Sequence, residues 1–279
     1  MLKKVTKILP LIEHRHSRGF TSVGLRSTVD TNIDPFLNID LFNMSAPTFP
    51  PHPHAGFSAV TYMLPESEGS FQNRDSFGDK SPIKPGDIHW TQAGSGMMHE
   101  EVPLVSGINC RGFQIFVNLS EKNKNLPPKA FHATASSLPL IKNANSSLTV
   151  VSGQTGQLTS PLRELATNVT ILDVTINANS NFLLDLDDEK NWFLFVISGE
   201  ALFAEKPIST NQAVLLSKAG QQIQLNANES GFRALICGGC PIGETVVWGG
   251  PFAMTSQEDI ERAYLRYRNG EMGRLAPSF

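Results

Sequence analysis

The residues best suited to metal chemistry form two pairs with the same spacing. His52 and His54 lie at positions i and i+2 in a Pro-His-Pro-His sequence, and His99 and Glu101 repeat that spacing. On a β-strand, residues two apart point to the same face. If the two strands are neighbours facing inward, three imidazoles and one carboxylate converge, while Glu100 points away. Such a set suits a divalent transition metal with open coordination positions.

The remaining histidines are weaker candidates for metal ligands. His14 and His16 repeat the spacing, but neighbouring arginines such as Arg15 would repel a cation. His89 stands alone in a strand-like run, which indicates a core or surface position, and we expect His132 to lie in a linker. The chemistry is therefore expected at the first two pairs.

The elements that position these residues are predicted to be strands. Short runs rich in Val, Ile, Phe and Thr alternate with clusters of Gly, Pro, Asn and Asp, a texture typical of sandwiches and barrels, jelly rolls included. The expected strands include 57–64, 111–118, 168–176, 192–197 and 232–237. The sequence thus predicts an all-β fold.

One segment near the end is predicted to be a helix. Thr255 and Glu258 have the spacing of a capping box, and Gly270 is a candidate for the residue that follows the helix. Four apolar or aromatic residues between them repeat at intervals of three and four, which gives a single apolar stripe: Ile260, Ala263, Tyr264 and Tyr267. We expect this helix to pack across a barrel.

A faint internal repeat indicates two copies of one β unit. Residues 86–94 can be laid over residues 212–220, and the alignment then places Leu225 where the first copy has His99 and Ala227 where it has Glu101. The second copy would therefore lack metal ligands. The expected division is an N-terminal metal-binding barrel at 1–135 and a C-terminal barrel with the helix at 136–279.

Composition narrows the classes of partner. The net charge is −3 and no stretch concentrates Lys and Arg, so the footprint of a nucleic-acid-binding protein is missing. No segment has the roughly 20 apolar residues that span a bilayer, and the first residues do not form the apolar run of a signal peptide. We therefore expect a cytoplasmic protein that binds neither nucleic acid nor membranes.

Several motifs together resemble the pirin family of bicupins. They are Asp34-Pro-Phe-Leu37, Pro51-His-Pro-His-Ala-Gly-Phe57, Arg74-Asp-Ser-Phe-Gly78, Pro85-Gly-Asp87, the segment 90–101 that ends Met-Met-His-Glu-Glu, and Gly249-Gly-Pro-Phe-Ala-Met254. The resemblance extends over nearly the whole chain. It implies two cupin (jelly-roll) barrels in tandem, with one metal ion on His52, His54, His99 and Glu101 of the first.

The resemblance also implies an activity. Several pirins are quercetin 2,3-dioxygenases, in which dioxygen attacks the central ring of a flavonol and carbon monoxide leaves. The implied cofactor is Fe(II), with Ni, Mn, Cu or Zn as alternatives, and Glu101 is the candidate to accept the proton of the substrate hydroxyl. Other family members resemble non-catalytic iron-binding regulators that act through a protein partner, and this alternative stays open.

Two positions depart from the family pattern, and three others are candidates for the pocket wall. Many cupins have Glu where this chain has Ser58, which we expect on the inward face with the histidines, and many bacterial relatives have His in place of Asn73. Phe57, Met97 and Met98 are close in sequence to the ligands. They are expected either to line an apolar pocket or to pack in the barrel.

Overall fold

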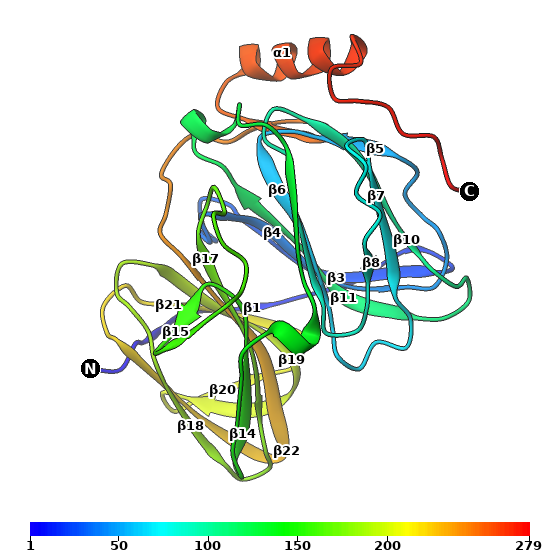
Figure 1. Cartoon of the computed structure of the whole chain (residues 1–279). Helices are drawn as coiled ribbons and strands as arrows, with labels where there is room; N and C mark the ends of the chain where they lie inside the picture. The colour runs from blue at the N-terminus through cyan, green and yellow to red at the C-terminus, as the bar shows by residue number, and fades with distance from the viewer.

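The computed structural model describes all 279 residues, and its strands gather into two lobes, one for each half of the chain (Figure 1). Each expected strand is present: β6 (Phe57–Met63), β11 (Cys110–Asn118), β17 (Val169–Ile176), β19 (Asn191–Phe203) and β22 (Gln222–Gly239). The last two are much longer than the apolar runs that predicted them. The predicted all-β fold with one C-terminal helix is confirmed.

Two sheets of the N-terminal lobe face each other. The larger contains, in spatial order, β12 (Lys129–Ala133), β9 (Ile88–Gln92), β6, β11, β4 (Phe36–Met44), β3 (Phe20–Arg26) and β2 (Glu13–Ser17). The smaller contains β5 (His52–His54), β10 (Met97–Pro103), β7 (Phe71–Asp75) and β8 (Pro82–Ile83). His132, expected in a linker, therefore lies in a strand, where it pairs with His89.

The C-terminal lobe is built on one large sheet. Its path is β1 (Val5–Pro10), β21 (Gln212–Leu216), β19, β22, β17, β14 (Ser146–Ser152) and β13 (Leu140–Lys142), while β18 (Asn181–Asp185) pairs with β22 and β20 (Lys206–Ser209) with β19. Leu225 and Ala227 belong to its buried apolar cluster. The places that the repeat assigns to His99 and Glu101 are thus filled by core side chains.

Short elements complete the chain. They are the ribbons β15 (Gln154–Thr155) with β16 (Leu158–Thr159) and β23 (Val247–Gly249) with β24 (Phe252–Met254), the 3-10 helices η1 (Glu121–Asn123) and η2 (Ala135–Ser137), and α1 (Gln257–Arg268). With 12 residues, α1 is too short and too polar to cross a bilayer. Its N-cap is Ser256 rather than Thr255, because the Ser256 hydroxyl accepts the Asp259 amide hydrogen at 3.1 Å.

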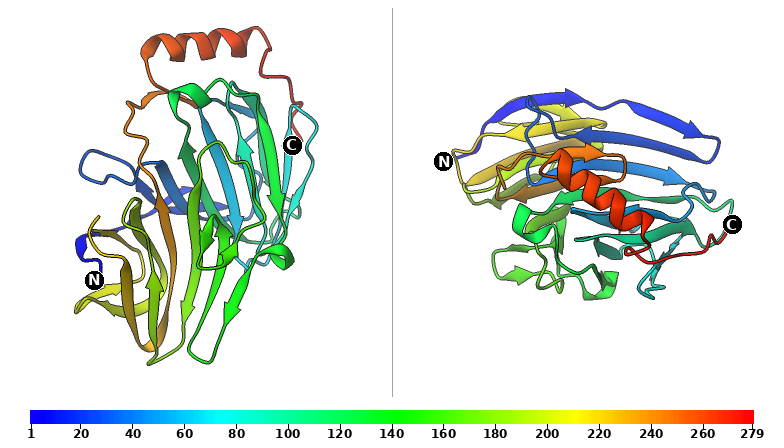
Figure 2. Two further views of the ribbon diagram at one scale, coloured as in Figure 1. Left: turned by 60° about the vertical axis from the view of Figure 1, so that its left-hand side comes forward. Right: turned by 90° about the horizontal axis from the view of Figure 1, so that it is seen from above.

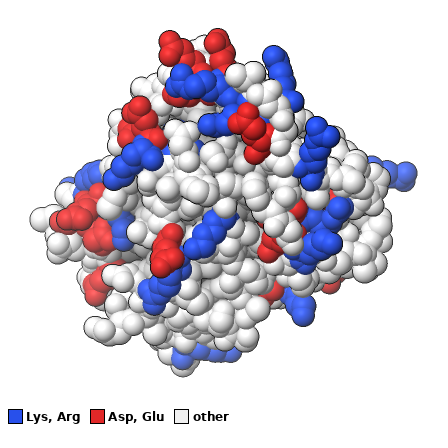
Figure 3. Space-filling model, turned by 45° about the horizontal axis from the view of Figure 1, so that its top comes forward, with Lys and Arg blue, Asp and Glu red and all other residues white.

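Both ends of the chain cross between the lobes. β1 pairs with β21 of the C-terminal sheet, while β24 bridges to Ala55 and α1 lies over the end of the N-terminal lobe (Figure 2). Lys and Arg are interspersed with Asp and Glu on the face that carries the helix (Figure 3). The division near residue 135 stays a prediction. The first strand of the chain belongs to the C-terminal sheet, and the last segment packs on the N-terminal lobe.

A buried polar network joins the lobes. The Tyr62 hydroxyl donates to Asp173 Oδ2 at 2.8 Å, and Arg233 donates to both oxygens of Asp173, at 2.9 and 2.7 Å. Arg233 also reaches Glu66 at 2.7 Å. Burial beside Asp173 raises the pKa of Tyr62 well above its usual value, so the hydroxyl remains a donor. These bonds fix the position of one lobe relative to the other.

We expect Tyr62→Phe to lower the free energy of unfolding by about 1–2 kcal/mol, because Asp173 loses one of its three donors but keeps Arg233. Urea unfolding followed by circular dichroism measures the change. The matched control is Tyr267→Phe, at an exposed position of α1, which should stay within about 0.5 kcal/mol of wild type. Equal stability of the two variants would contradict the role of the hydrogen bond.

Candidate metal centre

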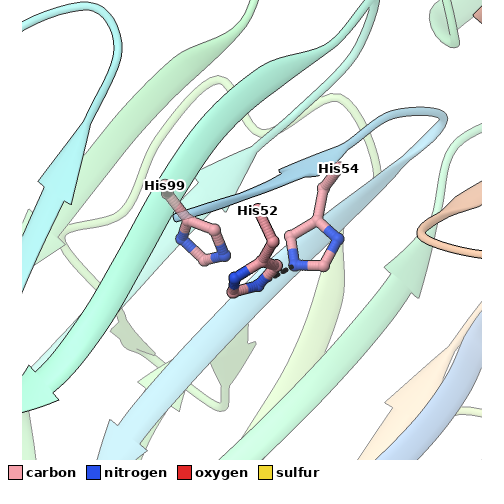
Figure 4. A group of neighbouring side chains, drawn as sticks. All are labelled: His52, His54 and His99. Atoms are coloured by element: carbon pink, nitrogen blue, oxygen red, sulfur yellow. Dashed lines mark hydrogen bonds between the residues drawn. The ribbon is translucent and has the colours of Figure 1, made fainter. Parts of the chain in front are cut away.

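Three histidines meet on the inner face of the smaller sheet. β5 and β10 pair antiparallel, with His99 opposite His52 and Met97 opposite His54. The ring centroids lie 4.7 to 4.8 Å apart, and one nitrogen of each ring lies within 4.8 Å of those of the other two (Figure 4). The strand pairing thus brings together two short motifs that are well separated in the sequence.

The tautomers of two of these rings leave their Nε2 atoms free. His52 Nδ1 lies 2.9 Å from the Pro50 carbonyl and His54 Nδ1 lies 3.4 Å from the Pro251 carbonyl. A carbonyl oxygen only accepts, so each Nδ1 carries the proton and each Nε2 presents a lone pair. The two Nε2 atoms are 3.2 Å apart. Two facing lone pairs repel each other unless a cation lies between or beside them, which is the arrangement of metal-binding histidines.

Burial keeps all three rings neutral. It lowers the pKa of His52, of His54 to about 3, and of His99 well below its usual value. Mutual repulsion among the rings lowers the pKa values of His54 and His99 further. A metal ligand must be the neutral imidazole. The residues present therefore fit a divalent transition metal.

Glu101 lines the same cavity as the three histidines but is not one of the group whose ligand atoms lie within 4.8 Å of one another. It is 8% exposed and accepts a hydrogen bond from the Thr61 hydroxyl at 2.6 Å. Burial raises the pKa of Glu101 to about 7, against the smaller opposing effect of the Thr61 bond. Glu100 points to the other face, where it pairs with Arg74, as alternation predicts. A carboxylate with this pKa can hold or release a proton at neutral pH.

The three imidazoles and Glu101 open on a cavity of about 690 Å³ between the two sheets. Aromatic rings form much of its wall. Phe116 lies 5.5 Å from the His54 ring, and a row of rings runs from His52 through Phe49 and Phe20 to His16, with centroid separations of 6.2, 5.3 and 4.6 Å. This wall suits a flat aromatic ligand.

Several cavity residues are not signalled by sequence spacing. Trp248 comes from β23, far along the chain, and His16 lines the cavity although its neighbouring arginines disfavour it as a metal ligand. The one sequence signal for Trp248 is that it directly precedes the Gly-Gly-Pro-Phe motif. Phe57, Met97 and Met98 do not line the cavity, although Phe57 packs 5.0 Å from the His54 ring.

The prediction for Ser58 was wrong. β6 pairs regularly with β9, so Ser58 shares a face with Val60 and Tyr62, which pack in the core between the lobes. The inner face carries Thr61, three residues away. Asn73, the other departure from the family pattern, lies opposite Glu101 on β7, does not line the cavity, and donates to Asp79 at 2.7 Å.

C-terminal segments support the strands that carry the three histidines. The Met272 carbonyl accepts hydrogen bonds from the Met98 amide at 3.1 Å and the Ser76 hydroxyl at 2.7 Å. The buried Lys124 ammonium donates to the Gly56 and Ala253 carbonyls at 2.8 and 2.9 Å. These contacts fix β10 and the turn after β5.

Comparison with known proteins matches both halves of the chain to pirin family models and to pirin-like relatives. Residues 14–117 match the Pirin family model, and residues 171–273 match the model of the pirin C-terminal cupin domain. A pirin-like protein of Solanum lycopersicum is 34% identical over 87% of this chain and 83% of its own length. A Pseudomonas aeruginosa protein, provisionally named quercetin 2,3-dioxygenase, is 34% identical over 85% of this chain and 86% of its own length.

A solved structure agrees with these relatives. The crystal structure of quercetin 2,3-dioxygenase from Acinetobacter baumannii matches with a TM-score of 0.88 and 25% identity, and the match covers 98% of this chain and 99% of that one. Both lobes are therefore cupin-type domains, as the sequence motifs imply. From these matches and the arrangement of its two lobes, the chain belongs to the pirin family.

Proposed function

We propose that this protein is an Fe(II)-dependent dioxygenase that cleaves a flavonol such as quercetin with dioxygen. The observation that carries the proposal is the opening of a three-imidazole group and a carboxyl group into one large aromatic cavity. The names of the Pseudomonas and Acinetobacter proteins support the same activity.

The residues that would hold the metal are His52, His54, His99 and Glu101. Their nitrogen and oxygen atoms accept Fe(II), Ni, Mn, Cu or Zn, so the donor set alone does not choose the metal. Bound Fe(II) would supply a Lewis acid that lowers the pKa of a substrate hydroxyl and a redox centre for dioxygen. The carbonyls of Pro50 and Pro251 hold the first two rings in the required tautomer.

Glu101 would accept the proton of the substrate hydroxyl. A coordinated carboxylate can lie within hydrogen-bond reach of a bound ligand, which is the requirement for a general base. The Thr61 hydroxyl donates to Oε2, which leaves Oε1 available to the cavity. The aromatic wall excludes water from the bound ring and orients it by stacking.

A non-catalytic regulator is the alternative that the sequence leaves open. It would be favoured by a closed pocket beside an exposed apolar surface. The cavity of about 690 Å³ is within the range of small-molecule sites, which favours an enzyme.

Metal removal and reloading test the proposal. Protein stripped with a chelator should consume no oxygen with quercetin, and anaerobic reloading with Fe(II) should restore uptake with about one iron per chain. Reloading in parallel with Ni(II), Mn(II), Cu(II) and Zn(II) identifies the metal that supports turnover. Iron bound at one per chain without oxygen uptake on any flavonol would contradict the dioxygenase and favour the regulator.

A further inference from the structure

A charged pair lines the cavity on the sheet that faces the histidines. Arg26 Nη1 lies 2.8 Å from Asp40 Oδ1, and the Asn38 side chain donates to Asp40 Oδ2 at 2.9 Å. All three residues line the cavity. None of them takes part in the metal group, so their placement calls for a separate explanation.

The backbone makes room for this pair. Gly24 lies opposite Asp40 on β3, and a Cβ at Gly24 would come within 2.3 Å of Asp40 Oδ1. A glycine inside a strand often marks such a close approach. The Asp40 carboxylate therefore lies over Gly24 of β3 and holds the Arg26 guanidinium at the cavity.

The pair still has hydrogen-bonding capacity. The Arg26 side chain is 57% exposed, and its Nη1 also reaches the Leu25 carbonyl at 3.3 Å, while Nε and Nη2 make no bond within the protein. The Asp40 side chain is 16% exposed and can accept further bonds. The cavity thus has a donor and an acceptor side by side, in a wall that is otherwise largely aromatic.

The separation from the metal group matches an aromatic ligand of two or three rings. Phe116 lies 5.5 Å from His54 and opposite Asn38 on the next strand. Adjacent strands are about 4.8 Å apart, and Asp40 is two residues, or about 6.6 Å, further along its strand. If these steps are at right angles to the 5.5 Å step, the straight-line separation of His54 from Asp40 is on the order of 10 Å. A ligand bound at the histidines would reach Asp40 with its far end.

We propose that Arg26 and Asp40 form a subsite that binds adjacent hydroxyl groups on the terminal ring of a polyphenol. The proposal rests on the proposed flavonol substrate. It adds that flavonols with two adjacent hydroxyls on the terminal ring bind more tightly than those without them. Two neighbouring hydroxyls can donate to Asp40 and accept from Arg26 together. A ligand carboxylate could only accept hydrogen bonds and would be repelled by Asp40. An unsubstituted ring would leave the remaining hydrogen-bonding capacity of Arg26 and Asp40 unfilled beside the bound ligand.

The test compares quercetin with galangin, which lacks only the two adjacent hydroxyls of the terminal ring. Titration calorimetry under argon, on iron-loaded protein, gives the dissociation constant of each. We expect wild type to bind quercetin about tenfold more tightly, the value of one net hydrogen bond. Arg26→Met and Asp40→Asn should bring the ratio close to one, while Arg15→Met, at an exposed position of β2 outside the cavity, should keep it tenfold.

Equal affinities in wild type, or a tenfold ratio that survives in both variants, would overturn the subsite, as would a failure to bind either flavonol. Admission of oxygen to the same samples separates this inference from the activity. A preserved tenfold ratio without oxygen uptake would contradict the dioxygenase and support the subsite. Oxygen uptake by a protein that binds quercetin and galangin equally well would support the dioxygenase and contradict the subsite.

Discussion

His99→Ala is expected to abolish stoichiometric metal binding and, with it, oxygen uptake. His52 and His54 come from one strand, and His99 is the imidazole that β10 adds opposite them. Loss of a residue that merely orients a ligand costs about 10- to 100-fold in metal affinity, so loss of a ligand should cost more than about 100-fold. The metal content of protein purified without chelator measures the effect directly.

The fold of this variant should survive, because the core between the lobes and the core of the C-terminal lobe contain none of the three histidines. Thermal unfolding followed by circular dichroism checks this point. The matched control is His14→Ala, which removes an exposed histidine of the other His-x-His pair and should retain about one metal per chain. A fully metal-loaded His99→Ala protein would show that the metal binds elsewhere.

Strand alternation, together with the condition that the two strands are neighbours facing inward, predicts this group of residues from the sequence. It puts His52 with His54 and His99 with Glu101, and β5 and β10 do lie side by side with all four residues facing the cavity. The argument works because the spacing of two residues stays within one strand in each case. Whether all four bind the metal stays a prediction.

The same argument fails for Ser58 for a physical reason. Parity holds only along an unbroken strand, and Gly56, with φ of 85°, lies between β5 and β6. The chain passes from one sheet to the other at this point, so the face of a residue in β6 cannot be deduced from the faces of residues in β5. Thr61, which holds Glu101, could therefore not be found by counting from the histidines.

The cavity wall shows the wider limit of sequence reasoning. Trp248, Phe116 and Asp40 line one cavity with the histidines only through the pairing of distant strands and the return of the C-terminal segment. Their spacing in the sequence carries no common period. The helix shows a smaller error, in which Thr255 and Ser256 both have capping side chains and the chain uses the second.

Metal affinity should rise with pH up to about 7 and then level off. Burial raises the pKa of Glu101 to about 7, so below this pH the carboxyl is largely protonated and must lose its proton to bind a cation. The histidines add no such step near neutral pH, because their pKa values are lowered, that of His54 to about 3. Below about pH 7, affinity should therefore fall about tenfold per pH unit, with about one proton released per metal.

Fe(II) titration calorimetry under argon, between about pH 5.5 and 8 in two buffers of different ionisation enthalpy, measures both the slope and the proton count. Glu101→Gln should remove the slope, and its turnover should fall by a factor on the order of 10²–10⁴, the usual contribution of a general base. Glu258→Gln, on the exposed face of α1, is the control and should keep the wild-type slope. A slope that persists in Glu101→Gln would assign the released proton to another group and contradict a Glu101 carboxyl that titrates at about pH 7.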